Sequence, residues 1–248
     1  DLHSFPTRRS SDLRTFADLH LSFDERIDKP MDVFGAGWDD HAERVRAAWT
    51  DLVTEADVVI IPGDISWGLK LDEAMADLEW IHNLPGQKVL LRGNHDLWWC
   101  RIQYLRTLYD DMHFLQNDCY YIEPLDIAVC GSRGWPTPDV IAYTEHDRKM
   151  YLREQGRLRN SLSEAKRIGA SRIITAMHYP PAKTEETEFT RIMQEFGVEQ
   201  CIYGHLHGMT AWENGIKGEY GGVDYRLVSL EDRKSTRLTP VTRTYLVC

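Results

Sequence analysis

Short apolar runs that alternate with helix-period segments, and that each stop abruptly, are the feature that most constrains the fold of this chain. Residues 56–62 (ADVVIIP) form a continuous, largely β-branched run that ends at Gly63, as expected of a strand buried on both faces. Shorter runs occupy residues 15–17, 88–91, 126–130, 172–177, 200–203 and 225–229. Helical periodicity fills the intervals, at about residues 39–55, 69–83, 101–109, 145–169 and 188–196. The alternation predicts one α/β domain over residues 14–230.

The two ends of the chain differ from this middle part. Residues 1–13 and 231–248 are polar, rich in Arg, Ser and Thr, and have neither a helical nor a strand period. The stretches SFPTRRSSDL (4–13) and EDRKSTRL (231–238) resemble translated adapter sequence. We therefore expect both ends to be non-native or disordered, and we leave them out of the fold prediction.

Composition limits the partners and the location of the protein. The 248 residues carry 29 Lys and Arg against 39 Asp and Glu, which is a formal net charge of −10. Such an acidic chain is a poor candidate for binding nucleic acid or an anionic membrane through bulk charge. There is no run of 18 apolar residues, so no transmembrane helix is expected. The five cysteines lack CxxC spacing and indicate reduced thiols, so we expect a cytoplasmic protein.

Polar and ionisable residues that follow the apolar runs are the main functional signal. In open α/β sheets, binding sites form just beyond the carboxyl ends of the strands. The motifs at these ends are Asp18-Leu19-His20, Gly63-Asp64, Gly93-Asn94-His95-Asp96, His178-Tyr179-Pro180-Pro181 and Gly204-His205-Leu206-His207-Gly208. We expect the side chains of these motifs to gather at one site.

The residue types in these motifs favour a site for two metal ions. Asp, Asn and His form a mixed oxygen and nitrogen donor set, which suits Mn, Fe, Zn or Co better than calcium. Two Asp, one Asn and four His would make seven ligands. Seven ligands are too many for one ion and about right for two ions that share a carboxylate. Asp64, on a short turn after a buried strand, is the natural bridging ligand between ions roughly 3.5–4 Å apart. We expect two divalent ions per chain, with Mn as the first choice.

In their order along the chain, the five motifs resemble those of the calcineurin-like metallophosphoesterases, over about residues 15–229. The resemblance implies a four-layer α/β/β/α sandwich of the metallo-dependent phosphatase type, with a dinuclear metal centre at the strand ends. Residues 94–99 and 130–135 resemble a bacterial group of predicted phosphohydrolases within the family. Carried over by motif, the resemblance implies one metal held by Asp18, His20, Asp64 and His207 and a second held by Asp64, Asn94, His178 and His205. His95 would face the leaving group without binding a metal.

Two features depart from the family pattern. The protein Ser/Thr phosphatase branch follows its Gly-Asp with an Asp-Arg pair, whereas residues 63–68 read Gly-Asp-Ile-Ser-Trp-Gly. The aspartate that would orient His95 and an arginine that would bind phosphate are both missing there, which argues against protein phosphatase activity. The apolar run before Asp18 is also shorter than is usual in the family, so we expect the first strand to be incomplete.

The reaction that we expect is hydrolysis of a small phosphodiester or phosphomonoester by a metal-bridging hydroxide. Two divalent ions, less the charges of Asp18 and Asp64, leave about +2, and a bridging water loses a proton there near neutral pH. Protonated His95 would act as general acid towards the departing alkoxide, so Asp64 and His95 are the expected catalytic residues. Arg92 and Arg133 follow strands and are candidates for bidentate phosphate binding or, alternatively, for structural ion pairs.

Two other functions remain open from the sequence. A nuclease or another phosphodiesterase that acts on a polymer would use the same metal ligands, but it would need a basic groove that the net charge of −10 argues against. A binding protein that keeps the fold without catalysis would not need the complete ligand set or His95. A salt titration of substrate affinity separates a small-substrate enzyme from a polymer-binding enzyme, because affinity for a polymer falls steeply with salt. Neither the physiological substrate nor the oligomeric state follows from the sequence.

Overall fold

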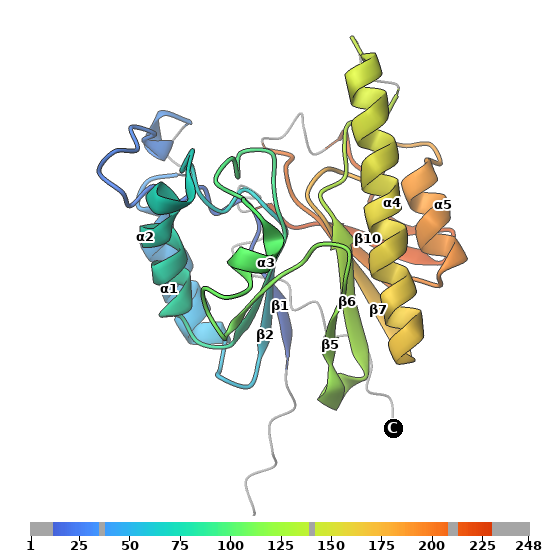
Figure 1. The fold of residues 1–248 in the computed structure, drawn as a ribbon, viewed down its shortest axis with the longest axis horizontal. Coiled ribbons are helices and arrows are strands. Elements are labelled where there is room, and N and C mark those ends of the chain that lie inside the picture. The colour runs from blue at the N-terminus through green and yellow to red at the C-terminus, as the bar shows by residue number, and fades with distance from the viewer. Residues whose placement is uncertain (1–11, 35–37, 139–141, 208–212, 230–248) are drawn as a thin grey trace, which may run out of the picture.

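Two β-sheets stacked face to face form the centre of the molecule (Figure 1). The computed structural model describes residues 12–34, 38–138, 142–207 and 213–229. The first sheet contains four parallel strands in the order β1 (Leu13–Thr15), β2 (Val58–Ile61), β3 (Gln87–Leu90) and β4 (Met112–Phe114). The second sheet has the order β5 (Tyr120–Ile122), β6 (Ile127–Ser132), β7 (Arg172–Met177), β8 (Gln200–Tyr203), β10 (Val223–Leu227) and β9 (Gly218–Tyr220). Its two edge strands, β5 and β9, run antiparallel to their neighbours, and the other pairs are parallel.

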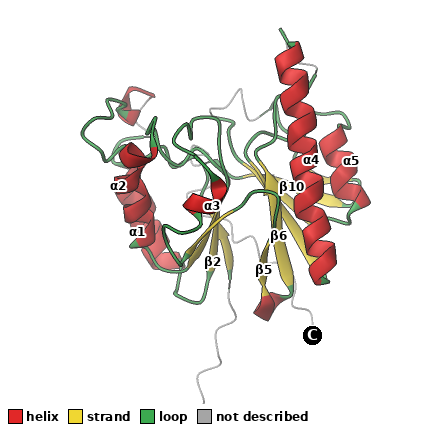
Figure 2. Cartoon of the chain, in the orientation of Figure 1, coloured by secondary structure: helices red, strands yellow, loops and turns green. Residues whose placement is uncertain are grey.

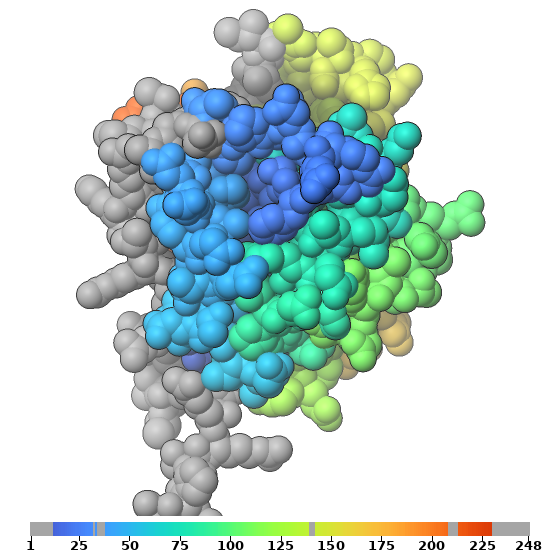
Figure 3. All heavy atoms as spheres, turned by 90° about the vertical axis from the view of Figure 1, so that its left-hand side faces the viewer, coloured from blue at the N-terminus to red at the C-terminus, as the bar shows by residue number. Residues whose placement is uncertain are grey.

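Helices cover the outer face of each sheet (Figure 2). On one side lie α1 (His41–Leu52) and α2 (Leu71–His82), together with the short helix α3 (Ile102–Leu105) and a 3₁₀ turn, η1 (Met31–Phe34). Seen from the side of α1 and α2, the surface consists mainly of residues from the first half of the chain (Figure 3). The other side carries α4 (Glu145–Ile168), which lies along β6, and α5 (Glu188–Glu195). A second 3₁₀ turn, η2 (Glu123–Leu125), joins β5 to β6.

The strand β2 explains how four layers are held together. Its alternate side chains point to opposite faces, so that Val58 and Ile60 pack between the two sheets while Val59 and Ile61 pack against α1 and α2. All four side chains are at least 96% buried. The β-branched run that predicted a strand buried on both faces is confirmed, and so is the four-layer α/β/β/α sandwich. None of the described helices is both long and apolar enough to cross a membrane.

The seven predicted strands and five predicted helices are all present. The strands β7 and β8 have the predicted bounds, and the ends of the other elements are shifted. The largest difference among the helices is α3, where only Ile102–Leu105 is helical within the predicted residues 101–109. Three strands were not predicted, namely β4, β5 and β9, and each is three residues long and lies at the edge of its sheet. A strand of three residues is too short to produce a recognisable period, and an edge strand has fewer neighbours to select its sequence.

The start of the domain also differs from the expectation. Leu13, placed in the excluded N-terminal segment, begins β1, and its side chain is fully buried between the two sheets. Asp12 precedes it, and its N–H donates to the carboxylate of Asp57 over 2.7 Å. These contacts extend the ordered domain to residue 12. The remaining predicted ends, 1–11 and 231–248, lie outside the described residues.

We predict that Leu13→Ala lowers the free energy of unfolding by about 2–5 kcal/mol, because it leaves a cavity between the sheets. The matched control is Leu97→Ala, at a leucine that is 57% exposed, and it should change the free energy of unfolding by less than about 0.5 kcal/mol. Urea unfolding at equilibrium measures both. Equal effects of the two substitutions would show that β1 does not pack between the sheets as described.

Candidate metal centre

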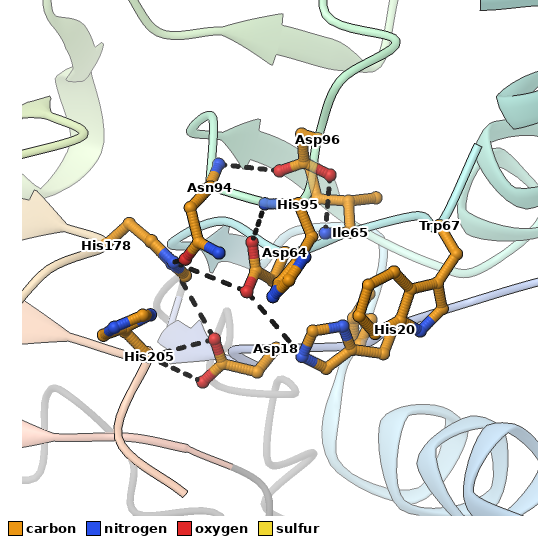
Figure 4. Close-up of polar contacts among 12 residues, drawn as sticks. Asp18, His20, Asp64, Ile65, Trp67, Asn94, His95, Asp96, His178 and His205 are labelled. Carbon is orange, nitrogen blue, oxygen red and sulfur yellow. Dashed lines mark hydrogen bonds and ion pairs between the residues drawn. The ribbon is translucent and has the colours of Figure 1, made fainter. Parts of the chain in front are cut away.

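The candidate ligands follow the carboxyl ends of β1, β2, β3, β7 and β8 and lie together where the two sheets meet (Figure 4). The structure brings them into two groups, Asp18, His20 and His207 in one and Asp64, His178 and His205 in the other. Within each group the ligand atoms lie within 4.8 Å of one another. Asn94 joins the second group through a distance of 2.6 Å between its Oδ1 and Nε2 of His178.

Asp64 lies between the two groups. Its Oδ2 atom is 3.7 Å from Nε2 of His20, in the first group, and 3.4 Å from Nε2 of His178, in the second. Its Oδ1 atom accepts a hydrogen bond of 2.9 Å from the backbone N–H of His95. One carboxylate oxygen is therefore directed at both groups, while the other is held by the backbone. This is the geometry needed of a carboxylate that bridges two ions.

The hydrogen bonds of His178 test whether a cation fits this site. Its Nδ1 atom lies 3.1 Å from the carbonyl oxygen of Pro62, which can only accept, so Nδ1 carries the ring proton. Nε2 then directs a lone pair towards Oδ1 of Asn94 and Oδ2 of Asp64. When Asp64 is ionised, three electron-rich atoms converge and repel one another, and a cation between them removes the repulsion. The residues present therefore fit a divalent metal ion.

The pKa values of the same groups lead to the same conclusion. Burial raises the pKa of Asp18, and burial together with the nearby Asp96 and Asp18 raises the pKa of Asp64. Burial is also the largest cause that lowers the pKa of His20 to about 2 and that of His205 to about 4. Burial also lowers the pKa of His178, so the rings of His20 and His178 are neutral at pH 7 and their contacts with Asp64 are not ion pairs. Buried carboxylates beside neutral imidazoles make a ligand set that lacks its positive charge.

The backbone of the site is held in an uncommon conformation. Four candidate ligands have positive φ angles, which are 56° for Asp18, 45° for His20, 51° for Asp64 and 71° for His205. The left-handed region costs a non-glycine residue about 1–2 kcal/mol. Hydrogen bonds compensate in part, because the N–H of His205 donates to both carboxylate oxygens of Asp18 over 3.0 and 3.1 Å. The loops are fixed in a shape that directs the side chains inward.

Two glycines make room for the approach of these loops. At Gly63, which has a φ of 97°, an added Cβ would lie 2.7 Å from Nδ1 of His178 and from Cα of Gly93. At Gly93, an added Cβ would overlap the backbone N and the carboxylate of Asp64. The loops that follow β2 and β3 can therefore pack this closely only with glycine at both positions.

Asp96 organises the site, although the sequence analysis gave it no role. Its Oδ1 atom accepts from the backbone N–H of Ile65 at 2.8 Å, that of Ser66 at 3.1 Å and the indole N–H of Trp98 at 3.0 Å. Its Oδ2 atom accepts from the N–H of Gly93 at 2.7 Å. The fully buried Asp96 thus ties the loop after β2 to the loop after β3. The feature of the sequence that could have identified Asp96 is its position in the Gly93–Asp96 motif.

Aromatic side chains form one wall of the site, which the sequence analysis also missed. The ring of Trp67 stacks on His20 at 4.8 Å between centroids and lies 4.3 Å from the ring of His95. The ring of Trp38 lies 5.7 Å from that of His207. His95 comes from the loop after β3 and is half-buried, and burial is the largest cause that lowers its pKa. His95 therefore stands beside the ligand groups, against Trp67.

Arg92 and Arg133, the predicted phosphate-binding residues, do not belong to either ligand group. The Nε–H of Arg92 donates to the carbonyl oxygen of Asp96 over 3.2 Å. The guanidinium of Arg133 lies over the ring of Trp135 at 4.5 Å, and its Nη2 atom is 4.0 Å from Oε1 of Glu154. Both arginines line a small pocket.

A two-sheet sandwich with Asp and His groups at the ends of its strands is the arrangement expected of a metal-dependent phosphoester hydrolase. The model of the calcineurin-like phosphoesterase family matches residues 15–209. The chain belongs to this family.

Further comparisons identify similar proteins. Gene 66 protein of Mycobacterium phage D29 is 38% identical over 80 residues, which are 32% of this chain and 38% of that protein. Two solved structures resemble the fold. A phosphopantetheinyl hydrolase from Mycobacterium tuberculosis has a TM-score of 0.50 at 14% identity, over 89% of each chain. The protein of unknown function AQ665 from Aquifex aeolicus has a TM-score of 0.44 at 15% identity, over 89% of this chain and 91% of that one.

We predict that Gly93→Ala lowers the affinity for Mn by at least about tenfold, because the added methyl group displaces Asp64. The control is Gly156→Ala in α4, where an added Cβ meets no atom within 4 Å. It should leave Mn affinity unchanged and stabilise the helix by about 0.5–1 kcal/mol. Calorimetric titration gives the affinities, and thermal unfolding checks that each variant is folded. A folded Gly93→Ala protein with unchanged affinity would contradict the role of this close approach.

Proposed function

We propose that the protein is a phosphoesterase with two divalent metal ions that hydrolyses a small phosphodiester or phosphomonoester. The observation that carries the proposal is the position of Asp64, whose Oδ2 atom faces both groups of candidate ligands. Asp18, His20, Asp64 and His207 would hold one ion, and Asp64, Asn94, His178 and His205 the other. We infer Mn as the native metal, with Fe, Zn or Co as alternatives, because the donor set mixes imidazole nitrogen with carboxylate and amide oxygen.

The residues around this centre have different roles in the proposed reaction. When bound, the two ions supply a hydroxide nucleophile at neutral pH and neutralise charge on the phosphoryl oxygens. Asp64 holds the two ligand groups at a fixed separation. His95, beside the ligands and against Trp67, is placed to give a proton to the leaving oxygen, and an approaching phosphate anion favours its protonated form.

The charge of the chain supports a small substrate over a polymer. With a net charge of −10, the protein repels nucleic acid at long range, and a metal centre of about +2 attracts a small phosphoester only locally. We infer a cytoplasmic enzyme from the unpaired use of cysteine. Among the described residues, Cys100, Cys119, Cys130 and Cys201 are free thiols.

The test of this function is turnover by the Mn-loaded protein. We expect bis(p-nitrophenyl) phosphate to be hydrolysed with a kcat/KM at least equal to that of p-nitrophenyl phosphate. The reason is that a dianionic monoester depends more on a dedicated arginine than a monoanionic diester does, and the Asp-Arg pair after Asp64 is absent. Removal of metal with EDTA should abolish both activities. A preference for the monoester that Arg133→Ala removes would identify Arg133 as the phosphate-binding residue and overturn the diester assignment. No turnover of any phosphoester would refute the function.

Substitutions of Asp64 and of His95 distinguish the effect of losing a metal ligand from the effect of losing a general acid. Elemental analysis of the wild-type protein should approach two equivalents of Mn, and Asp64→Asn should reduce both together, because the shared charge is lost. His95→Asn should keep two equivalents and lower kcat by about 10²–10⁴-fold, with the larger loss for the poorer leaving group. Loss of metal from the His95 variant would make His95 a ligand and contradict its assignment as the acid.

A further inference from the structure

A pocket lined by three arginines lies next to the metal-binding loops. We name it the arginine pocket, and its charged lining residues are Arg92, Arg133, Glu154 and Arg157. The lining residues follow the carboxyl ends of β3, β4 and β6 and come from one turn of α4, which lies along β6 (Figure 1). The pocket is therefore at the same end of the sandwich as the metal centre.

The charges of the arginine pocket are not balanced. Three guanidinium groups face one carboxylate, that of Glu154, which leaves a local charge of +2. Only Arg157 forms a close ion pair with it, at 2.8 Å between Nη1 and Oε1, while Nη2 of Arg133 is 4.0 Å away. The side chains of Arg133, Glu154 and Arg157 are 14%, 1% and 16% exposed. Like charges are thus held together at a place with little water.

Two buried polar atoms in this pocket have no hydrogen-bond partner. They are Nε of Arg133 and Oε2 of Glu154, on side chains that are 14% and 1% exposed. A buried donor without an acceptor costs about 1–3 kcal/mol, and more when the group is charged. An anion bound beside the guanidinium of Arg133 would offset the excess positive charge of the pocket. The side chain of Arg157 is 16% exposed, so the pocket is reachable from outside.

Backbone connections join the arginine pocket to the metal centre. Arg92 is separated by one glycine from Asn94, and its side chain holds the carbonyl of Asp96. The carbonyl oxygen of Arg133 accepts from the N–H of His178 over 3.2 Å. Arg92 thus shares a loop with Asn94, and the loop of Arg133 is hydrogen-bonded to the loop of His178.

We propose that the arginine pocket binds a second phosphate group of the substrate, so that the preferred substrates carry a terminal phosphate at a distance from the phosphoester that is cleaved. A phosphate monoester has a charge of about −1.5 to −2 at neutral pH, which matches the excess of +2, whereas a carboxylate matches only half of it. The planar guanidinium groups suit the tetrahedral oxygens of phosphate. This proposal deepens the proposed function and rests on it for the position of the first phosphate.

The test uses alkane-1,ω-bisphosphonates of two to six carbons and the alkylphosphonates of the same lengths, because their C–P bonds resist hydrolysis. Calorimetry with the Mn-loaded protein should give, for at least one chain length, a Kd about tenfold lower for the bisphosphonate than for the monophosphonate. An ω-carboxyalkylphosphonate of the same length should bind more tightly than the monophosphonate by a smaller factor. Arg157→Gln should remove the gain. Arg148→Gln, at an exposed arginine of the same helix that pairs with Glu145, should retain it.

A further variant separates binding from a merely structural role of these side chains. Glu154→Gln keeps the shape of the side chain and raises the local charge, so it should increase the gain from the second phosphonate, whereas a structural role predicts no increase. The proposal is wrong if no bisphosphonate binds more tightly than its monophosphonate, or if the gain survives Arg157→Gln in a folded protein. A gain that Arg157→Gln removes, in a protein that hydrolyses no phosphoester, would refute the hydrolase and leave the pocket established.

Discussion

The burial of two carboxyl groups among neutral histidine rings is the constraint on which the rest of the structure depends. Asp18 and Asp64 are at least 99% buried, and burial makes their ionised forms unfavourable. Backbone N–H groups stabilise them in part, and the left-handed conformations of the ligand loops add a further cost. The rigid sandwich beneath maintains this arrangement, and cations at the site would remove most of the electrostatic cost.

Most of the fold could be predicted because its strands are buried on both faces and end abruptly. The candidate ligands could be predicted for the same reason, since parallel strands deliver the residues that follow them to one place. Asp96 and Trp67 were missed because their roles depend on contacts across two loops, and a sequence shows no such contacts. Glu154 and Arg157 were missed for a related reason. They are on a helix, and the hydrophobic pattern of a helix indicates which side faces the sheet. It does not indicate which residues of the neighbouring strand ends lie opposite that side.

The two sheets contribute different parts of the centre. Asp18, His20, Asp64 and Asn94 follow strands of the first sheet, whereas His178, His205 and His207 follow strands of the second. Each ligand group contains residues from both sheets. The separation between ligands is therefore set by the apolar layer between the sheets, to which Leu13, Ile60 and Ile174 belong. A change of volume in that layer, far from the chemistry, would move one half of the centre against the other.

The hydrogen bonds between Asp18 and His205 join residues 187 positions apart. A contact of this kind has a large loop-closure entropy, so it forms late, after each sheet has assembled on its own helices. During synthesis, the segment with Asp18, His20, Asp64 and Asn94 leaves the ribosome well before the histidines of the second sheet. Complete metal sites would then exist only after the two sheets have docked. Metal uptake would thus act as a late checkpoint that distinguishes a finished chain from a half-folded one.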